Sequence, residues 1–182
     1  MGHGARDGGT SCGDDPQGSV VEREHMRKRI EVDTQLEHPV ERVFAYLADP
    51  MKWHDFAPAV VMRDPISDGP VRIGSRWSAT DRIIFSKIHF IDELVEYEPH
   101  RRAAWRSSAP WNALTTYACE PMAGGTRVSA TYEGDVRGWL RILSYVPDVV
   151  LWWVLSGDFR RLRRRLAADE RAGVGVGARA SG

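Results

Sequence analysis

The sequence is poor in cysteine, with only Cys12 and Cys119 among 182 residues. Two cysteines cannot build a disulfide scaffold, so the simplest expectation is two free thiols in a reducing cytoplasm.

The sequence also lacks an excess of either charge, because 25 lysines and arginines balance 25 aspartates and glutamates. A protein that binds nucleic acid through bulk electrostatics is clearly basic, so we expect no nucleic-acid partner.

Long apolar runs and the common catalytic motifs are missing as well. Residues 1–27 lack the continuous apolar stretch of a signal peptide, and Arg141, Pro147 and Asp148 interrupt the one segment that approaches a membrane span. The six histidines have no metal-ligand spacing, and no GxSxG, P-loop or Rossmann motif occurs. We therefore predict neither a metal nor a cofactor.

The composition divides the chain into three parts. Residues 1–27 are rich in Gly, Asp and Ser without an apolar period, which predicts a disordered leader. Residues 171–182 are rich in Gly and Ala and predict a disordered tail. The remaining residues, 28–170, are expected to form one folded domain, in which no linker or internal repeat is visible.

The hydrophobic period within residues 28–170 predicts the order of the elements. Alternation over 28–36 indicates a strand, Pro39 begins a short helix that ends at Asp49-Pro50, and a second short helix follows over 51–58. The period then becomes two, and turn residues divide this part into six candidate strands. These strands are 59–64, 75–84, 86–97, 101–109, 112–120 and 125–134.

A helical period returns from about residue 136 to residue 169. Over 148–168 it forms one apolar stripe of Leu151, Trp152, Leu155, Phe159, Leu162 and Leu166. This helix is the only element long enough to cover the apolar face of a curved antiparallel sheet of about seven strands. Because one helix covers such a sheet incompletely, we expect an α+β fold with a cavity between the two.

Several stretches of the chain carry a family resemblance. They are IEVDTQLEHPVERVFAYLADPMKWHDFAPAV, Gly74, the Glu-Tyr-Glu-Pro at 96–99 and the Glu-Pro…Gly-Gly-Thr-Arg-Val hairpin at 120–128. In these, residues 28–170 resemble the START-like, or SRPBCC, superfamily, and within it the polyketide cyclase/dehydrase branch. The resemblance implies the helix-grip fold, in which a curved sheet wraps around a long C-terminal helix and two short helices follow the first strand.

The resemblance leaves two functions open, because one superfamily hosts cyclases, dehydratases, lipid carriers and binding proteins. The first is a cytoplasmic enzyme of secondary metabolism that assists cyclisation or dehydration of a polyketide. The second is a non-catalytic carrier of a lipid or another apolar small molecule. Both imply a hydrophobic ligand, polyketide-like or lipid-like, in the cavity. No catalytic signature can be carried over, so the site residues come from strand alternation.

Two strands each place one aspartate among the apolar residues of the inner face. The inward residues are Trp77, Ala79, Asp81 and Ile83 in one strand, and Ile88, Phe90, Asp92 and Leu94 in the next. A tight turn near Phe85-Ser86 is expected to pair Ile83 with Ile88, which sets the two aspartates diagonally on that face. Burial raises the pKa of a carboxyl group, so Asp81 and Asp92 are candidate catalytic acids or bases. The alternative is that one or both meet an inward arginine or lie at a wet rim.

Further inward side chains complete the predicted site. Tyr117 and Tyr132 are candidate catalytic donors to a carbonyl oxygen, with an ordinary core position as the alternative. The predicted ligand-binding residues are Trp77, Phe90, Trp105, Thr115, Trp152 and Leu155. For the three tryptophans in this set, ordinary core packing is again the alternative.

The C-terminal helix also carries a feature typical of membrane contact. Residues 149–155, VVLWWVL, are apolar on every side, and a dense arginine run follows at 160–165. This pattern is typical of an interfacial helix that meets anionic lipid. The alternative is that the apolar turn is buried between the sheet and the short helices, with the arginines solvated.

Overall fold

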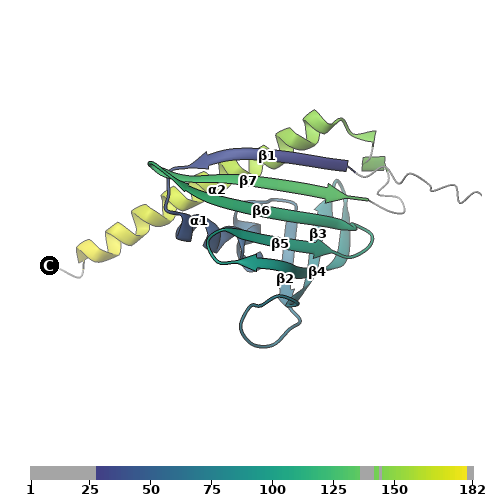
Figure 1. Cartoon of the computed structure of the whole chain (residues 1–182), viewed down its shortest axis with the longest axis horizontal. Helices are drawn as coiled ribbons and strands as arrows, with labels where there is room; N and C mark the ends of the chain where they lie inside the picture. The colour runs from purple at the N-terminus through teal and green to yellow at the C-terminus, as the bar shows by residue number, and fades with distance from the viewer. Residues whose placement is uncertain (1–27, 136–141, 144, 180–182) are drawn as a thin grey trace, which may run out of the picture.

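The computed structural model describes residues 28–135, 142–143 and 145–179, with side chains as far as residue 172. Seven antiparallel strands form one curved sheet in the order β1-β7-β6-β5-β4-β3-β2, and one long helix, α2, lies along its concave side (Figure 1). The leader predicted over 1–27 and part of the helical segment predicted from residue 136 lie outside the described residues.

The elements follow the predicted order and form the helix-grip fold. The first strand and the two short helices are β1 (Lys28–Leu36), α1 (Val40–Leu47) and the 3₁₀ helix η1 (Pro50–Asp55). The other six strands are β2 (Val60–Pro65), β3 (Arg76–Ile83), β4 (Ser86–Glu98), β5 (Arg102–Ser107), β6 (Ala113–Met122) and β7 (Gly125–Gly134). The chain ends with α2 (Asp148–Arg179).

Local chemistry explains the two short helices. Pro39 is the N-cap of α1, with an extended ψ of 148°, and Asp49 caps η1 by accepting a hydrogen bond of 3.0 Å from the Met51 amide. The indole of Trp53 donates to the Leu47 carbonyl at 3.0 Å, which ties η1 to the end of α1. Trp53 is therefore buried under the short helices, where it forms one wall of the interior.

The C-terminal half of α2 closes the sheet. Phe159, Leu162 and Leu166 follow one another at helical spacing and are at most 3 % exposed. They pack in the same core as Leu36 of β1 and Val128 of β7. The helix then runs on to Arg179, so residues 171–179, predicted as part of a disordered tail, are helical.

The register of the β3–β4 hairpin differs from the expectation. Ile83 pairs with Ser86 rather than with Ile88, because the loop consists of Ile84 and Phe85. The shift is two residues, and a shift of two leaves every side chain on the same face of the sheet. Asp81 and Asp92 therefore both lie on the inner face, as the alternation predicts.

Candidate functional site

Two adjoining cavities lie between the sheet and α2. The inner cavity, of about 160 Å³, is lined by buried residues that include Arg63, Asp92 and Tyr117. The outer cavity, of about 300 Å³, is lined mainly by apolar side chains, among them Leu151 and Val154 of α2. The walls shared by both are Ala59, Trp111, Thr115, Tyr132, Leu155 and Asp158. The two cavities therefore adjoin each other, with polar groups in the inner cavity and mainly apolar walls in the outer cavity.

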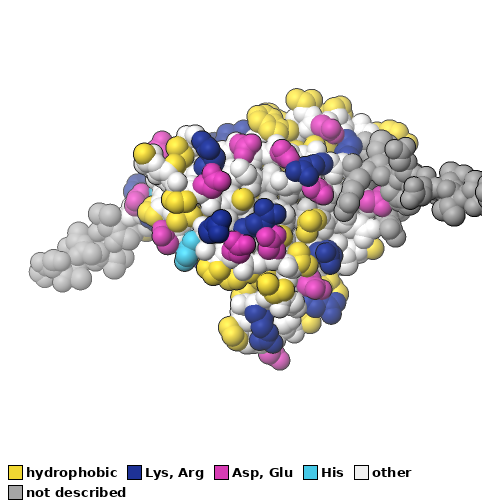
Figure 2. Space-filling model, in the orientation of Figure 1, with side chains coloured by type: hydrophobic (Ala, Val, Ile, Leu, Met, Phe, Trp, Pro, Cys, Tyr) yellow, Lys and Arg dark blue, Asp and Glu magenta, His cyan; other side chains and the backbone are white. Residues whose placement is uncertain are grey.

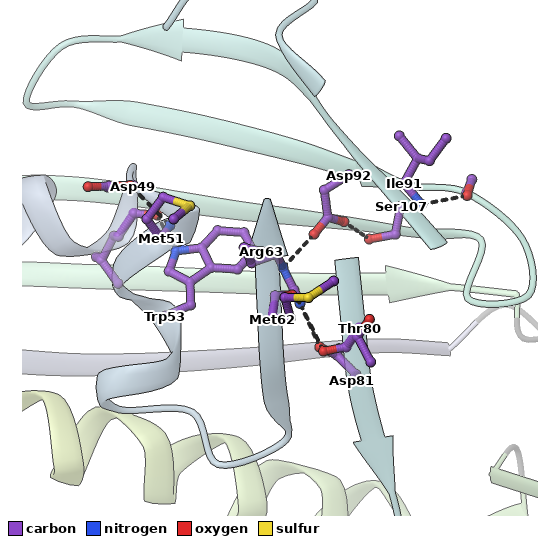
Figure 3. A network of polar contacts seen from close by, with 12 residues as sticks. Asp49, Met51, Trp53, Met62, Arg63, Thr80, Asp81, Ile91, Asp92 and Ser107 are labelled. Carbon is purple, nitrogen blue, oxygen red and sulfur yellow. Dashed lines mark hydrogen bonds and ion pairs between the residues drawn. The ribbon is translucent and has the colours of Figure 1, made fainter. Parts of the chain in front are cut away.

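Arg63 of β2 lies at the centre of the polar end (Figure 3). Its Nη1 atom is 2.8 Å from Oδ1 of Asp81, and its Nε atom is 2.9 Å from Oδ2 of Asp92. The small side chain of Ala79, directly opposite Arg63 in the β2–β3 pairing, leaves room for the guanidinium. The rings of Trp53 and Phe90 have their centroids 5.5 and 5.3 Å from its Cζ atom. Arg63 is thus held by two carboxylates and two aromatic rings.

The two aspartates are buried, and polar neighbours hold both of them. Asp81 is 6 % exposed and Asp92 is 1 % exposed, and Ser107 donates a hydrogen bond of 2.6 Å to Oδ1 of Asp92. The guanidinium of Arg63 is within ion-pair distance of Oδ1 of Asp81 and of Oδ2 of Asp92, so each of these oxygens has a charged partner. The two aspartates are therefore held in place by the protein itself while they line the inner cavity.

The charge of this cluster is unbalanced. Burial raises the pKa of both Asp81 and Asp92, and Arg63 opposes the shift. One guanidinium neutralises only one of two carboxylates, so the fully ionised cluster carries a buried negative charge. The cluster is therefore suited to take up a proton. The inward arginine weighed as an alternative is present, and the two aspartates are linked through it rather than lying diagonally across from each other.

Two tyrosines from neighbouring strands line the inner cavity beside this cluster. The rings of Tyr117 and Tyr132 are nearly perpendicular, with centroids 6.2 Å apart. Burial raises the pKa of both phenols, which keeps them protonated as donors at neutral pH. The buried indole N–H of Trp105 has no hydrogen-bond partner among the described residues, which leaves one more donor beside the same cavity.

Asp158 of α2 is an ionisable wall residue that the sequence reasoning missed. It lines both cavities, and its charge contributes to the raised pKa of Tyr117 and Tyr132. Burial raises the pKa of Asp158 to about 6, although Arg161 lies 2.9 Å away and opposes the shift. One signal for Asp158 was available, because position 158 continues the helical stripe from Leu151 and Leu155 toward the sheet.

The predicted ligand-binding residues divide into two groups. Phe90, Trp105, Thr115 and Leu155 line the inner cavity. Trp77 and Trp152 line neither of these two cavities, so the structure does not bring them together with the other four. Trp77 is buried behind Trp105, with ring centroids 5.1 Å apart, and Trp152 is 46 % exposed. Trp152 follows Leu151 by one residue, which turns its side chain about 100° away from the wall-forming face of the helix.

Residues 27–169 match the family described as polyketide cyclase / dehydrase and lipid transport. The chain belongs to this family. No curated protein matches the sequence significantly. The family's description covers both catalysis and transport, so membership supports a ligand-binding domain and leaves the two functions open.

Solved structures with low sequence identity share the fold. A protein of Thermus thermophilus, TTHA0849, has a TM-score of 0.65 at 16% identity, over 78% of this chain and 99% of that one. The di-domain ARO/CYC protein StfQ of the steffimycin biosynthetic pathway has a TM-score of 0.60 at 19% identity, over 84% of this chain and 54% of that one. Ara h 8.0201 has a TM-score of 0.56 at 13% identity, over 78% of this chain and 99% of that one.

Other site chemistries find little support in the part of the family domain that the structure describes. Within 28–135, 142–143 and 145–179, no group of His, Cys, Asp and Glu side chains has the arrangement of a metal site. Burial raises the pKa of the Cys119 thiol to about 12, so this cysteine stays protonated and is a poor nucleophile. No helix in these residues is long and apolar enough to cross a membrane.

Proposed function

We propose that this protein binds a hydrophobic, carbonyl-bearing small molecule of polyketide type and assists its cyclisation or dehydration by acid/base catalysis. One observation carries the proposal: ionisable groups converge in an inner cavity, and the cavity that adjoins it is lined mainly by apolar side chains. An apolar site with a few convergent polar groups and perturbed pKa values is what such chemistry requires.

The shape of the cavity supports an orientation for the ligand. Its apolar part would lie in the outer cavity against Leu151, Val154 and Leu155, and its carbonyl end would enter the inner cavity. There the N–H of Trp105 offers a hydrogen bond for which the described parts of the chain provide no acceptor. Confinement of a flexible chain in this way brings distant carbon atoms together and lowers the entropic cost of ring closure.

The polar groups take complementary roles in this proposal. A carboxylate of Asp81 or Asp92 removes a proton from the carbon next to a carbonyl, and the hydroxyl of Tyr117 or Tyr132 stabilises the resulting enolate oxygen. The enolate carbon attacks a second carbonyl of the same chain, and the protonated carboxyl returns its proton to the alkoxide that forms. Asp158, with a pKa of about 6, is placed to supply or accept a further proton.

A second candidate, a carrier without chemistry, is favoured by a different observation. Arg63 contacts both Asp81 and Asp92 and gives the cluster a counter-charge, which is a structural reason for their burial that needs no catalysis. In a carrier the apolar outer cavity would hold the ligand, and the inner cluster would only fix the strands.

The test combines binding with turnover. The apolar dye Nile red should bind the full chain at about one-to-one stoichiometry. The N-acetylcysteamine thioester of a linear poly-β-ketone, used as a probe substrate, should cyclise faster with the protein than without it. Asp81→Asn or Asp92→Asn keeps the shape of the side chain and removes its titration. Turnover should then fall by a factor of about 10²–10⁴ while dye binding survives.

The control is Asp64→Asn, an exposed aspartate of β2 outside both cavities, which should leave turnover unchanged. Dye binding without any acceleration of the probe, or acceleration that survives both active-site substitutions, would refute the catalytic proposal and leave the carrier. A protein that binds no apolar probe at all would refute both.

A further inference from the structure

Exposed apolar side chains lie next along the chain to wall residues of the outer cavity. Its wall includes Ile83 at the end of β3 and both Leu151 and Val154 in the first turns of α2. Next to these residues along the chain lies a set of strongly exposed apolar side chains, which we call the mouth patch. Its members, with their exposed fractions, are Ile84 67%, Phe85 100%, Val149 69%, Val150 45%, Trp152 46% and Trp153 63%.

The α2 members of the mouth patch lie close together in the first turns of the helix. Apolar side chains gather over the N-terminal half of α2, along the upper edge of the molecule, and further apolar side chains lie among basic and acidic ones elsewhere on the face shown (Figure 2). The expected alternative, in which the apolar turn 149–155 is buried, does not hold for Val149, Trp152 and Trp153. Concentrated exposed apolar surface of this kind marks a binding surface.

The tip of the β3–β4 hairpin carries an unfavourable choice of residues. Ile84 has a φ of 55° as the first of two loop residues, a position that favours glycine in two-residue hairpins. A β-branched residue in this region is strained, and the next residue, Phe85, is fully exposed. Packing against the described residues explains neither side chain, which points to an apolar environment outside the fold.

Cations border the apolar side chains on both elements. Arg82 and Lys87 lie directly opposite each other at the base of the hairpin tip, where like charges repel. On α2 the guanidinium of Arg160 lies over the ring of Trp153, with Cζ 5.8 Å from the centroid. None of these three cations forms an ion pair with an acidic residue in the described parts of the chain.

We infer that the mouth patch docks on an anionic lipid surface. Exposed Phe, Ile and Trp side chains bordered by unpaired Arg and Lys match the acyl region and the charged headgroups of such a surface. A second copy of the chain fits less well, because a symmetric contact through the patch would oppose the same cations. The docking does not depend on the proposed function, and it would open the outer cavity toward the apolar part of the bilayer.

The test is co-sedimentation of the full chain with vesicles. The protein should bind vesicles of phosphatidylcholine and phosphatidylserine, bind phosphatidylcholine alone weakly, and lose affinity as the salt concentration rises. Phe85→Ser or Trp153→Ser should weaken binding by about tenfold or more, because each removes a large inserted apolar side chain. The double variant Arg82→Gln with Lys87→Gln should lose most of the preference for phosphatidylserine.

The matched control is Ile73→Ser, which removes a side chain that is 61% exposed in the β2–β3 loop and should leave vesicle binding unchanged. Absence of binding to phosphatidylserine vesicles, or equal losses in Ile73→Ser and Phe85→Ser, would overturn the inference. So would a concentration-dependent dimer that Phe85→Ser abolishes, since it would assign the patch to a second copy. Nile red binding without vesicles should survive Phe85→Ser, so failure of docking remains distinct from failure of the cavity.

Discussion

Arg63 is the residue that makes two buried aspartates compatible with the fold. It is 6% exposed and contacts both carboxylates, while its Nη1 atom also donates to the carbonyl of Met62 at 2.8 Å. A buried ion pair adds little net stability, but the loss of one partner leaves the other charge uncompensated. In this cluster, the loss of Arg63 would leave the carboxylates of both Asp81 and Asp92 without a counter-charge.

Arg63→Met should therefore destabilise the protein strongly. Methionine fills part of the same volume without a charge, so the expected loss in the free energy of unfolding at neutral pH is about 3–5 kcal/mol. The measurement is urea denaturation followed by circular dichroism. The control, Arg102→Met, removes an exposed cation that contacts Glu96 at 2.8 Å and should change stability little.

The same variant should change the pH dependence of stability. Because the folded-state pKa values of Asp81 and Asp92 are raised, the folded protein binds more protons than the unfolded chain between the ordinary and the raised pKa, so stability falls as pH rises through that window. Without Arg63 both pKa values rise further, and the fall becomes deeper and extends to higher pH. A loss in Arg63→Met that does not depend on pH would show that the arginine acts through packing alone.

Sequence alternation predicts where both aspartates point but not what they meet. Period two places Asp81 and Asp92 among residues that have to be buried, and a register error of two cannot change that. Arg63 escapes the same reasoning because β2 is an edge strand with a bulge between Val60 and Met62, which breaks the alternation. Only charge balance, two inward acids without a cation, pointed to an inward arginine.

At the scale of elements, α2 performs two tasks along its length. Its later turns place Phe159, Leu162 and Leu166 in the core, whereas its first turns leave Val149 and Trp153 exposed beside the outer cavity. The helix thus closes one end of the curved sheet and leaves the other end open. The outer cavity lies at the end where the first turns of α2 do not pack tightly against the sheet.

Phe159→Ala should reveal the closing task. Removal of a side chain that is 3% exposed in a packed core should lower the free energy of unfolding by about 3–5 kcal/mol, as large-to-small core changes do. Val150→Ala, on the same helix and 45% exposed, should cost far less. Urea denaturation measures the free energy of unfolding of both variants. Equal and small losses in this free energy would mean that α2 does not hold the sheet.

The order and type of the elements could be predicted because they follow from local signals. The change of period from 3.6 to two, Pro39 at the start of α1 and the turn residues between strands are all local. The rotation of α2 is not local, since Trp152 and Phe159 share the predicted stripe and only the packing of the later turns sets which side faces the sheet. That is why Trp152 was misplaced and Phe159 was not.

At the scale of the whole molecule, the cavity is the feature that joins the site to the surface. Leu155 lies in the wall common to the inner and the outer cavity, between the Arg63 cluster and the mouth patch. A ligand that spans both cavities has to pass this side chain. Its size therefore decides whether the two ends act as one site.

Leu155→Trp should block the cavity while leaving the fold intact. The larger side chain has free volume to occupy, so the stability cost of overpacking should stay below that of Phe159→Ala. Affinity for Nile red should fall at least about tenfold, and the rise in melting temperature that a bound ligand produces should disappear. Val150→Trp, which adds the same ring outside the cavity walls, should preserve both. Because the exposed mouth patch can also attract an apolar dye, Phe85→Ser is measured alongside. If Leu155→Trp keeps its affinity for Nile red and Phe85→Ser loses it, the dye binds at the exposed mouth patch and not in the cavity.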